Sequence, residues 1–136
     1  MVEFFDSNIF VYYVDSRDPE KQAVAERLVE TALNGDEMCL ISVQALTEFV
    51  NVALNKIKLP YEIVGQYLEV FSELPAVSPD PNLVKRGLEI KQRYQIQFYD
   101  AMMIAAAEKV GASRIYSEDL NDSQLYCGVR AVNPFK

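Results

Sequence analysis

Residues 98–119 read FYDAMMIAAAEKVGASRIYSED, and this segment constrains the fold more strongly than any other. Nearly every position from Ala101 to Ala107 is apolar, which predicts a helix that is buried on all sides. Gly111 is expected to end this helix, and Arg114–Tyr116 is expected to form the strand that follows it. A buried helix leading into a strand is typical of a sheet that helices cover on both faces.

Short apolar runs and amphipathic segments alternate through the rest of the chain. Further strands are expected at Val2–Phe5, Met38–Ile41, Pro75–Val77 and Val129–Val132. Further helices are expected at Asn8–Val14, from Asp18-Pro19 to Asn34-Gly35, from Ser42 to Ile57, from Pro60 to Leu74, and from Asp80-Pro81 to Tyr94. This alternation predicts an α/β fold with a parallel sheet. The length of 136 residues fits a single domain that spans residues 1–136.

The composition excludes several kinds of catalytic site. The chain contains no histidine, which rules out Ser-His-Asp and Cys-His catalysis and the usual zinc sites. Cys39 and Cys127 are expected to be reduced thiols, as in a cytoplasmic protein. The N-terminus lacks the basic region of a secretory signal, and no apolar run approaches the roughly 18 residues that span a bilayer. The expected location is therefore the cytoplasm, with no membrane partner.

Acidic residues outnumber basic ones, with 20 Asp and Glu against 13 Lys and Arg and a formal net charge of −7. This balance by itself argues against nucleic-acid binding, because phosphates attract basic surfaces. A group of carboxylates that holds divalent cations changes that expectation. Such a group adds to the negative total, yet it attracts phosphate once the cations are bound.

Four acidic residues are placed so that they can form such a group. Asp6 directly follows the first strand, and Asp119 follows the strand at Arg114–Tyr116. Glu48 lies on the polar stripe of the helix after the second strand. Because ligands bind beyond the carboxyl ends of parallel strands, these three acids are expected at one edge of the sheet. Asp100 joins them if the buried helix that it opens also begins at that edge.

Four neighbouring carboxylates repel one another and need a compensating cation to remain ionised. Oxygen ligands without histidine or thiolate favour Mg²⁺ or Mn²⁺. One or two such ions can ionise an attacking water and neutralise the charge that builds on a phosphodiester. Asn8 is expected to orient Asp6 or a water on the metal, and Ser117 to hydrogen-bond Asp119 or a phosphate.

Each acid also has an ordinary structural explanation. The two aspartates that follow strands can be turn residues, and Glu48 can be a solvated residue on a helix face. Asp100 can be an acid in the first turn of a helix, where the helix dipole favours it. Glu118 and Asp122 are weaker candidates than Asp119, because Asp119 combines a position near the strand end with an expected inward direction.

The order and spacing of four segments resemble a known family. The segments are FFDSNIFVYY (residues 4–13), ISVQALTEFVNV (41–52), FYDAMMIAAAEKVGASRIYSEDLNDSQ (98–124) and VNPF (132–135). Together they look like a PIN domain, and more narrowly like the toxin ribonuclease of VapBC-type toxin–antitoxin pairs. The resemblance covers essentially the whole chain, and its motifs are specific in combination although each is short.

The resemblance implies a three-layer α/β/α sandwich with a central parallel sheet, and a magnesium- or manganese-dependent endoribonuclease. It places the catalytic, metal-binding acids of the family at Asp6, Glu48, Asp100 and Asp119. Ser117 and Asn8 match the positions of a supporting hydroxyl and a supporting asparagine. The resemblance also implies an RNA substrate, a homodimer, and a small antitoxin that covers the acidic groove.

Two other functions stay open at the level of the sequence. A phosphohydrolase of the haloacid-dehalogenase type would use Asp6 as a covalent nucleophile. That class usually has a second aspartate where Asn8 stands here, and a lysine near the last acid that is missing around Asp119. A non-catalytic PIN-like domain would instead bind a partner through its acidic face.

Overall fold

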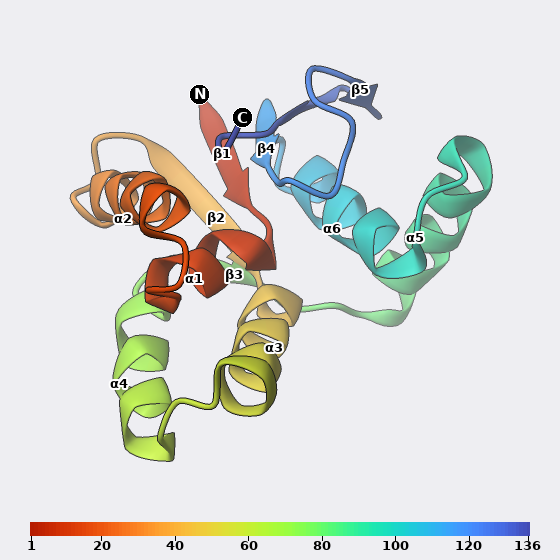
Figure 1. The fold of residues 1–136 in the computed structure, drawn as a ribbon. Helices are drawn as coiled ribbons and strands as arrows, with labels where there is room; N and C mark the ends of the chain where they lie inside the picture. Colours follow the sequence, from red (N-terminus) through yellow and green to blue (C-terminus); the bar gives the residue numbers. More distant parts are fainter.

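The computed structural model describes residues 1–136 and has a six-stranded sheet of order β3-β2-β1-β4-β6-β5 (Figure 1). In chain order the strands are β1 (Val2–Phe5), β2 (Met38–Ser42), β3 (Ala76–Val77), β4 (Arg114–Tyr116), β5 (Leu125–Tyr126) and β6 (Val129–Val132). All pairs from β3 to β6 are parallel, and β5 alone runs antiparallel to its neighbour. The predicted α/β class is confirmed, and the predicted parallel sheet gains one antiparallel edge strand.

Six α-helices cover this sheet. They are α1 (Ser7–Val14), α2 (Pro19–Leu33), α3 (Val43–Val52), α4 (Tyr61–Phe71), α5 (Pro81–Tyr94) and α6 (Phe98–Lys109). Helices α1 and α2 lie on one side of the sheet, and α5 and α6 lie on the other (Figure 1). Helix α6 contacts β2, β4 and β6 directly, and α5 packs against α6. The protein therefore has the three layers of an α/β/α sandwich.

Local sequence signals account for two of the helix starts. The Asp18 side chain accepts a hydrogen bond from the Lys21 backbone N–H at 3.2 Å, and the Asp80 side chain accepts one from Leu83 at 2.8 Å. In both helices a proline occupies the first turn, where its missing N–H has no cost because that group has no partner within the helix. These caps explain why α2 and α5 begin where the sequence predicts.

Strand β1 is central, and its position brings distant parts of the chain together. Phe5 at the end of β1 lies beside Ile41 of β2 and Tyr116 of β4. The pairing continues for one residue, because the Asp6 backbone N–H donates to the Tyr116 carbonyl at 3.0 Å. The residues that follow β1 and β4 therefore meet at the carboxyl edge of the sheet.

A cluster of aromatic rings around Phe71 joins the helices near this edge. Phe71 is fully buried, and its ring centroid lies 4.5 Å from that of Phe10 in α1 and 5.0 Å from that of Phe49 in α3. Aromatic pairs at such distances stabilise a fold beyond the area that they bury. The packing fixes α3, which carries Glu48, against α1.

The structure corrects several boundaries of the predicted elements. The helix after Ser42 is α-helical only to Val52, and Ala53–Ile57 forms a π-helical turn that ends at Lys58 with a left-handed φ of 64°. Helix α4 ends at Phe71 instead of Leu74. A continuous apolar stripe does not distinguish an α-turn from a π-turn, because the two differ by one residue in hydrogen-bond spacing.

The structure also describes the two cysteines and the hydropathy of the helices. Cys39 is buried in β2 and Cys127 is partly exposed, and both are free thiols. None of the helices combines the length and the hydropathy that a membrane crossing requires.

The contact between α5 and α6 depends on a small residue. A Cβ atom at the buried Gly87 would lie 2.6 Å from the Met102 sulfur and 3.3 Å from Met102 Cγ. Gly87→Leu is expected to lower the free energy of unfolding by about 1–3 kcal/mol, the usual cost of overpacking. Gly65→Leu in α4 is the matched control, because nothing lies within 4 Å of its Cβ. There the better helix propensity of leucine should raise stability. Urea titrations of both variants test this, and equal effects would contradict the packing argument.

Candidate metal centre

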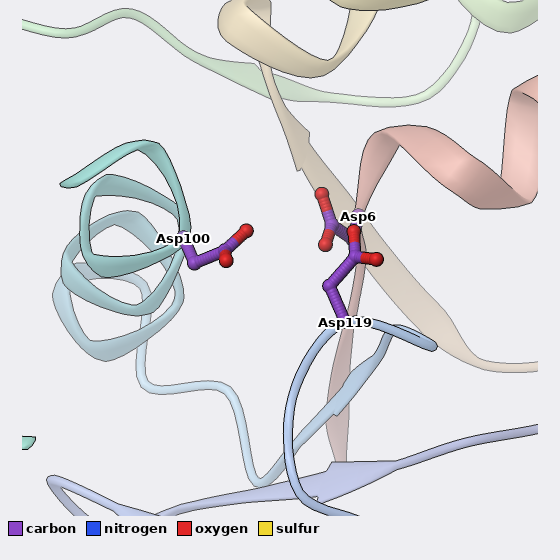
Figure 2. A group of neighbouring side chains, drawn as sticks. All are labelled: Asp6, Asp100 and Asp119. Carbon is purple, nitrogen blue, oxygen red and sulfur yellow. The ribbon is translucent and has the colours of Figure 1, made fainter. Parts of the chain in front are cut away.

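Three aspartates converge at the carboxyl edge of the sheet (Figure 2). Asp6 follows β1, Asp119 lies in the loop after β4, and Asp100 lies in the first turn of α6. One carboxylate oxygen from each lies within 4.8 Å of the others. The sheet brings Asp6 and Asp119 together, and the packing of α6 against the sheet adds Asp100.

The Asp6 carboxylate is the most firmly held of the three. Asp6 is 3% exposed and caps α1, since its Oδ1 accepts the Ser7 backbone N–H at 2.7 Å. Its Oδ2 accepts a hydrogen bond from the Ser117 hydroxyl at 2.6 Å. Donors from the segments that follow β1 and β4 therefore fix the direction of this side chain.

The Asp119 carboxylate is exposed and has a single side-chain donor. Its Oδ2 accepts a hydrogen bond from Asn8 Nδ2 at 3.1 Å, and its backbone N–H donates to the Ser117 hydroxyl at 3.1 Å. The sequence predicted that Asn8 orients Asp6 or a water on the metal, and that Ser117 hydrogen-bonds Asp119 or a phosphate. In the structure Asn8 donates to the Asp119 carboxylate. The Ser117 hydroxyl accepts from the Asp119 backbone N–H, as predicted, and also donates to the Asp6 carboxylate, because the adjacent parallel strands β1 and β4 place each residue beside the acid of the neighbouring strand.

Asp100 meets the condition that the sequence left open. Helix α6 begins at the carboxyl edge of the sheet, so its first-turn acid joins the other two (Figure 2). The residues that follow Asp100 in α6, Ala101 to Ala107, are all nearly inaccessible to solvent. Asp100 therefore lies at the boundary between core and solvent.

Glu48 lies beside this group without being one of the three. Its Oε2 accepts a hydrogen bond from the Ser7 hydroxyl at 2.6 Å, and its Oε1 accepts one from Gln44 Nε2 at 2.9 Å. Gln44 also donates to the Tyr99 carbonyl at 3.2 Å, so it links α3 to the start of α6. The roles of Ser7 and Gln44 were not predicted from the sequence. The spacing of four residues between Gln44 and Glu48 was the available signal for the second contact.

The two weaker acidic candidates lie outside the three-aspartate group. Glu118 forms an ion pair with Lys21 at 3.1 Å. Asp122 accepts a hydrogen bond from the Asn133 backbone N–H at 2.8 Å and forms an ion pair with Lys136 at 3.5 Å. Both have partners that satisfy their charge, unlike the aspartates of the group.

Burial and mutual repulsion make these carboxylates hard to ionise. Loss of hydration raises the pKa of Asp6 to about 7, with a smaller contribution from the nearby Asp119 and Asp100 charges. Loss of hydration, together with Asp119 and Glu48, raises the pKa of Asp100 to about 6. Loss of hydration also raises the pKa of Asp119, against the opposing effect of the Asn8 hydrogen bond. A bound cation would remove this penalty.

The residues at this edge fit a hard divalent cation. Three carboxylate oxygens are close enough to share one ion, and no sulfur or imidazole ligand is near. The buried Asn8 Oδ1 has no hydrogen-bond donor in the protein, so a water on a bound ion could supply one. Oxygen ligands of this kind suit Mg²⁺ and Mn²⁺.

The raised pKa values predict a pH dependence of the metal-free protein. Asp6 and Asp100 keep their protons to a higher pH in the folded state than in the unfolded chain. The folded state therefore binds more protons, and the free energy of unfolding falls as the pH rises from about 4, the pKa in the unfolded chain, to about 7, the pKa of Asp6 in the folded protein. The contribution of Asp6 is at most about 4 kcal/mol. Urea titrations in EDTA measure this fall, which Asp6→Asn should reduce and Mn²⁺ should reverse. A rise in stability over this range would contradict the argument.

The chain matches one protein family and is similar to several solved structures. The PIN domain family model matches residues 4–125. A toxin–antitoxin complex from Klebsiella pneumoniae is 18% identical over 97% of both chains, with a TM-score of 0.68. VapC20 of Mycobacterium tuberculosis, a toxin that cleaves the sarcin–ricin loop, is 15% identical over 88% of this chain and 91% of its own, with a TM-score of 0.69.

A third similar structure is VapBC2 from Rickettsia felis bound to a DNA fragment from its promoter. It is 18% identical over 86% of this chain and 87% of that chain, with a TM-score of 0.61. No curated protein sequence matches the chain. At these identities the solved structures establish a shared fold, and that fold agrees with the three layers described above.

Proposed function

The chain belongs to the PIN domain family, and from this premise we propose that it is a metal-dependent endoribonuclease, the toxin of a toxin–antitoxin pair. The observation that carries the proposal is the convergence of Asp6, Asp100 and Asp119 at the carboxyl edge of the sheet. Proteins of the same fold include VapC20, which cleaves the sarcin–ricin loop. The substrate class is therefore RNA, and the reaction is hydrolysis of a phosphodiester bond.

We assign the metal-holding role to the three aspartates, with Glu48 extending the acidic surface on the α3 side. A divalent cation bound by these residues would act as a Lewis acid, which would activate a water and offset the charge that builds on the phosphodiester. Ser117 and the Ser7 backbone N–H keep the Asp6 carboxylate in one orientation. Ser7 and Gln44 do the same for Glu48. Carboxylates that are already held in place reduce the reorganisation that accompanies the reaction.

The protonation of Asp6 couples ion binding to pH. With a pKa of about 7, Asp6 loses its proton when a cation takes its place at the carboxylate, so binding should release protons below neutral pH. The same shift makes Asp6 a poor covalent nucleophile in the free protein. Both of its carboxylate oxygens accept hydrogen bonds, and only 3% of the residue is exposed. These contacts count against the phosphohydrolase alternative.

A small antitoxin is the proposed protein partner. The similar structures from Klebsiella pneumoniae and Rickettsia felis are, respectively, a toxin–antitoxin complex and the VapBC2 pair. An antitoxin that places a basic side chain near the three aspartates would offset their charge, as a cation does. Exposed apolar side chains such as Tyr61 of α4 and Leu88 of α5 offer contact surface for this partner or for a second copy of the chain.

Cleavage of a mixed pool of structured RNA by the purified protein tests the function. We expect cleavage with Mn²⁺ or Mg²⁺, none with EDTA, and inhibition when the product of the neighbouring gene is added. Cleavage that persists in EDTA would contradict the metal-dependent mechanism. Binding of Mn²⁺ without cleavage of any RNA would favour the non-catalytic partner-binding domain. Transfer of phosphate label to Asp6 would favour the phosphohydrolase.

A further inference from the structure

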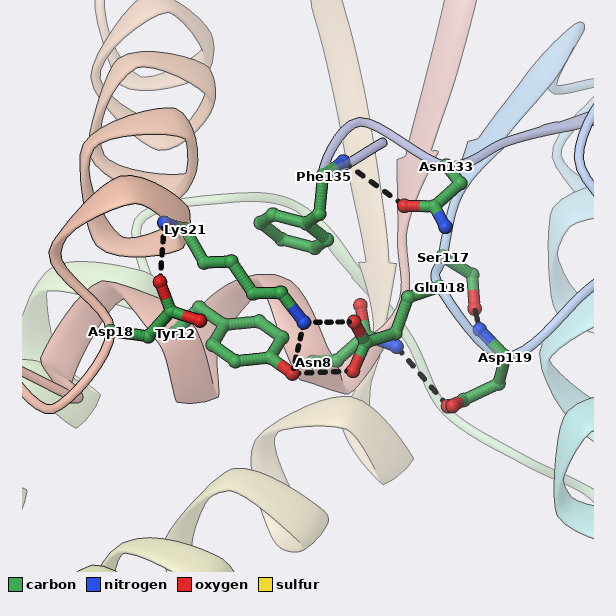
Figure 3. Close-up of polar contacts among 9 residues, drawn as sticks. All are labelled: Asn8, Tyr12, Asp18, Lys21, Ser117, Glu118, Asp119, Asn133 and Phe135. Carbon is green, nitrogen blue, oxygen red and sulfur yellow. Dashed lines mark hydrogen bonds and ion pairs between the residues drawn. The ribbon is translucent and has the colours of Figure 1, made fainter.

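A polar cluster lies next to the three aspartates and has no part in the assignment above (Figure 3). The Lys21 ammonium donates to Glu118 Oε2 at 3.1 Å and to the Tyr12 hydroxyl at 3.1 Å. The Tyr12 hydroxyl donates to Glu118 Oε1 at 2.6 Å. Lys21, Tyr12 and Glu118 therefore form a closed triangle, in which each side chain contacts the other two. We call this the Lys21–Tyr12–Glu118 triangle.

Aromatic packing holds the triangle in place. The ring centroids of Tyr12 and Phe135 are 4.8 Å apart, and the Lys21 nitrogen lies 4.7 Å from the Tyr12 centroid. A cation over an aromatic face is stabilised by the electrostatics of the ring. The Phe135 backbone N–H donates to Asn133 Oδ1 at 3.0 Å, so the C-terminal segment is also part of the support.

The triangle connects directly to the metal centre through two pairs of neighbouring residues. Asn8 and Tyr12 are four residues apart in α1 and so lie on the same face of that helix. Glu118 and Asp119 are consecutive in the loop after β4. Asn8 contacts Asp119 and Tyr12 contacts Glu118, so one face of α1 holds two successive carboxylates of the same loop.

Asp119 needs this support more than the other aspartates do. It is exposed, and Asn8 is the one side chain that donates to its carboxylate. Its orientation therefore depends on how the loop backbone is held at the preceding residue. Lys21 also offsets the charge of Glu118, which would otherwise add a free carboxylate beside the three aspartates.

We propose that the Lys21–Tyr12–Glu118 triangle holds the Asp119 carboxylate in the orientation that binds a metal ion, and thereby sets the affinity of the site for a divalent cation. Glu118 acts through the loop and is not itself a metal ligand. The inference rests on the proposed function, because it concerns the metal centre of that function. It adds three residues, from α1, α2 and the loop after β4, to those that control the site.

Calorimetric titration of the whole protein with Mn²⁺ tests the proposal, using variants that each remove one contact. Tyr12→Phe removes the hydroxyl and keeps the ring, and Lys21→Met removes the charge and keeps the aliphatic stem. Tyr12→Phe should weaken Mn²⁺ binding by about tenfold, as is usual for residues that orient metal ligands. Lys21→Met should weaken it by less, because the unpaired charge of Glu118 attracts the cation and offsets part of the loss. The double variant should weaken binding less than the product of the two, because both act through Glu118.

Two further variants separate an effect on the orientation of Asp119 from an effect on the stability of the whole protein. Lys109→Met breaks a surface ion pair with Asp80 (3.6 Å) far from the metal centre, so it should leave Mn²⁺ affinity unchanged. Lys21→Arg keeps a cation beside Glu118 and should bind Mn²⁺ nearly as the wild type does. Melting temperatures of the Lys21→Met and Lys109→Met proteins should be similar.

For RNA cleavage, Lys21→Met should lower kcat by about tenfold with little change in KM.

The outcomes distinguish this inference from the proposed function. Unchanged Mn²⁺ affinity in Tyr12→Phe and Lys21→Met would overturn the positioning role, even if the wild type cleaves RNA. If the wild type binds Mn²⁺ but cleaves no RNA, the proposed function fails, and a weaker affinity in the two variants still supports the positioning role. A wild type that binds no Mn²⁺ overturns both.

Discussion

Replacing Asp6 with asparagine is expected to lower the rate of RNA cleavage by about a thousandfold or more, because metal-based stabilisation of the transition state is worth several kcal/mol. Asparagine has nearly the same shape as the neutral acid, which burial already favours at this position. The variant should therefore fold. At alkaline pH its metal-free form should be at least as stable as the wild type, since one of the mutually repelling charges is gone.

A matched substitution shows whether the effect belongs to the site. Asp122 lies in the same loop region as Asp119 but contacts the C-terminal segment instead of the three aspartates. Asp122→Asn should cleave RNA at nearly the wild-type rate. Wild-type activity in Asp6→Asn, measured on protein that is free of contaminating nuclease, would refute the assignment of the centre.

Glu48→Gln is expected to cost about a hundredfold in cleavage, the upper end of the range for residues next to metal ligands. Glutamine is isosteric, and its amide oxygen can still accept the Ser7 hydrogen bond, but its amide nitrogen cannot accept the one from Gln44. The loss therefore reports the charge of Glu48 together with its hydrogen bond to Gln44. Single-turnover rates at saturating Mn²⁺ measure the chemical step apart from metal binding. Glu69→Gln, on the exposed surface of α4, removes the same charge away from the site and serves as the control.

A Glu48→Gln protein that cleaves as fast as the control would show that the side chain is only a solvated residue of α3. That result would leave the three aspartates as the whole centre. A loss as large as that of Asp6→Asn would indicate that Glu48 contacts the metal directly, in an arrangement tighter than the one described here.

The sequence predicted the acids of the site better than it predicted the contacts between them. Asp6 and Asp119 follow strands, and parallel strands end at one edge, so their convergence could be derived. The position of Asp100 depended on where α6 begins, which periodicity cannot decide for a helix that is apolar on all sides. The contacts of Asn8 with Asp119 and of Ser117 with Asp6 depend on the β1–β4 pairing, and local sequence patterns do not predict the order of strands in a sheet.

Two other features of the structure were not predicted from the sequence, for similar reasons. Strand β5 is two residues long and pairs antiparallel with β6 across a tight turn, so it is too short for a pattern of alternation to appear. Lys21 and Glu118 are 97 residues apart in the chain. Each looks like an ordinary surface charge in the sequence, and their relation to Asp119 became visible only when α1, α2 and the β4 loop were placed together.

Anomalous diffraction from a crystal of the protein soaked in Mn²⁺ would show whether the three aspartates bind the metal. We expect a manganese peak between Asp6, Asp100 and Asp119, with carboxylate oxygens about 2.1 Å away. The same crystal form of Asp6→Asn should show a weaker peak or none. A strong peak elsewhere, with none at this edge of the sheet, would contradict the claim that these carboxylates hold the catalytic metal.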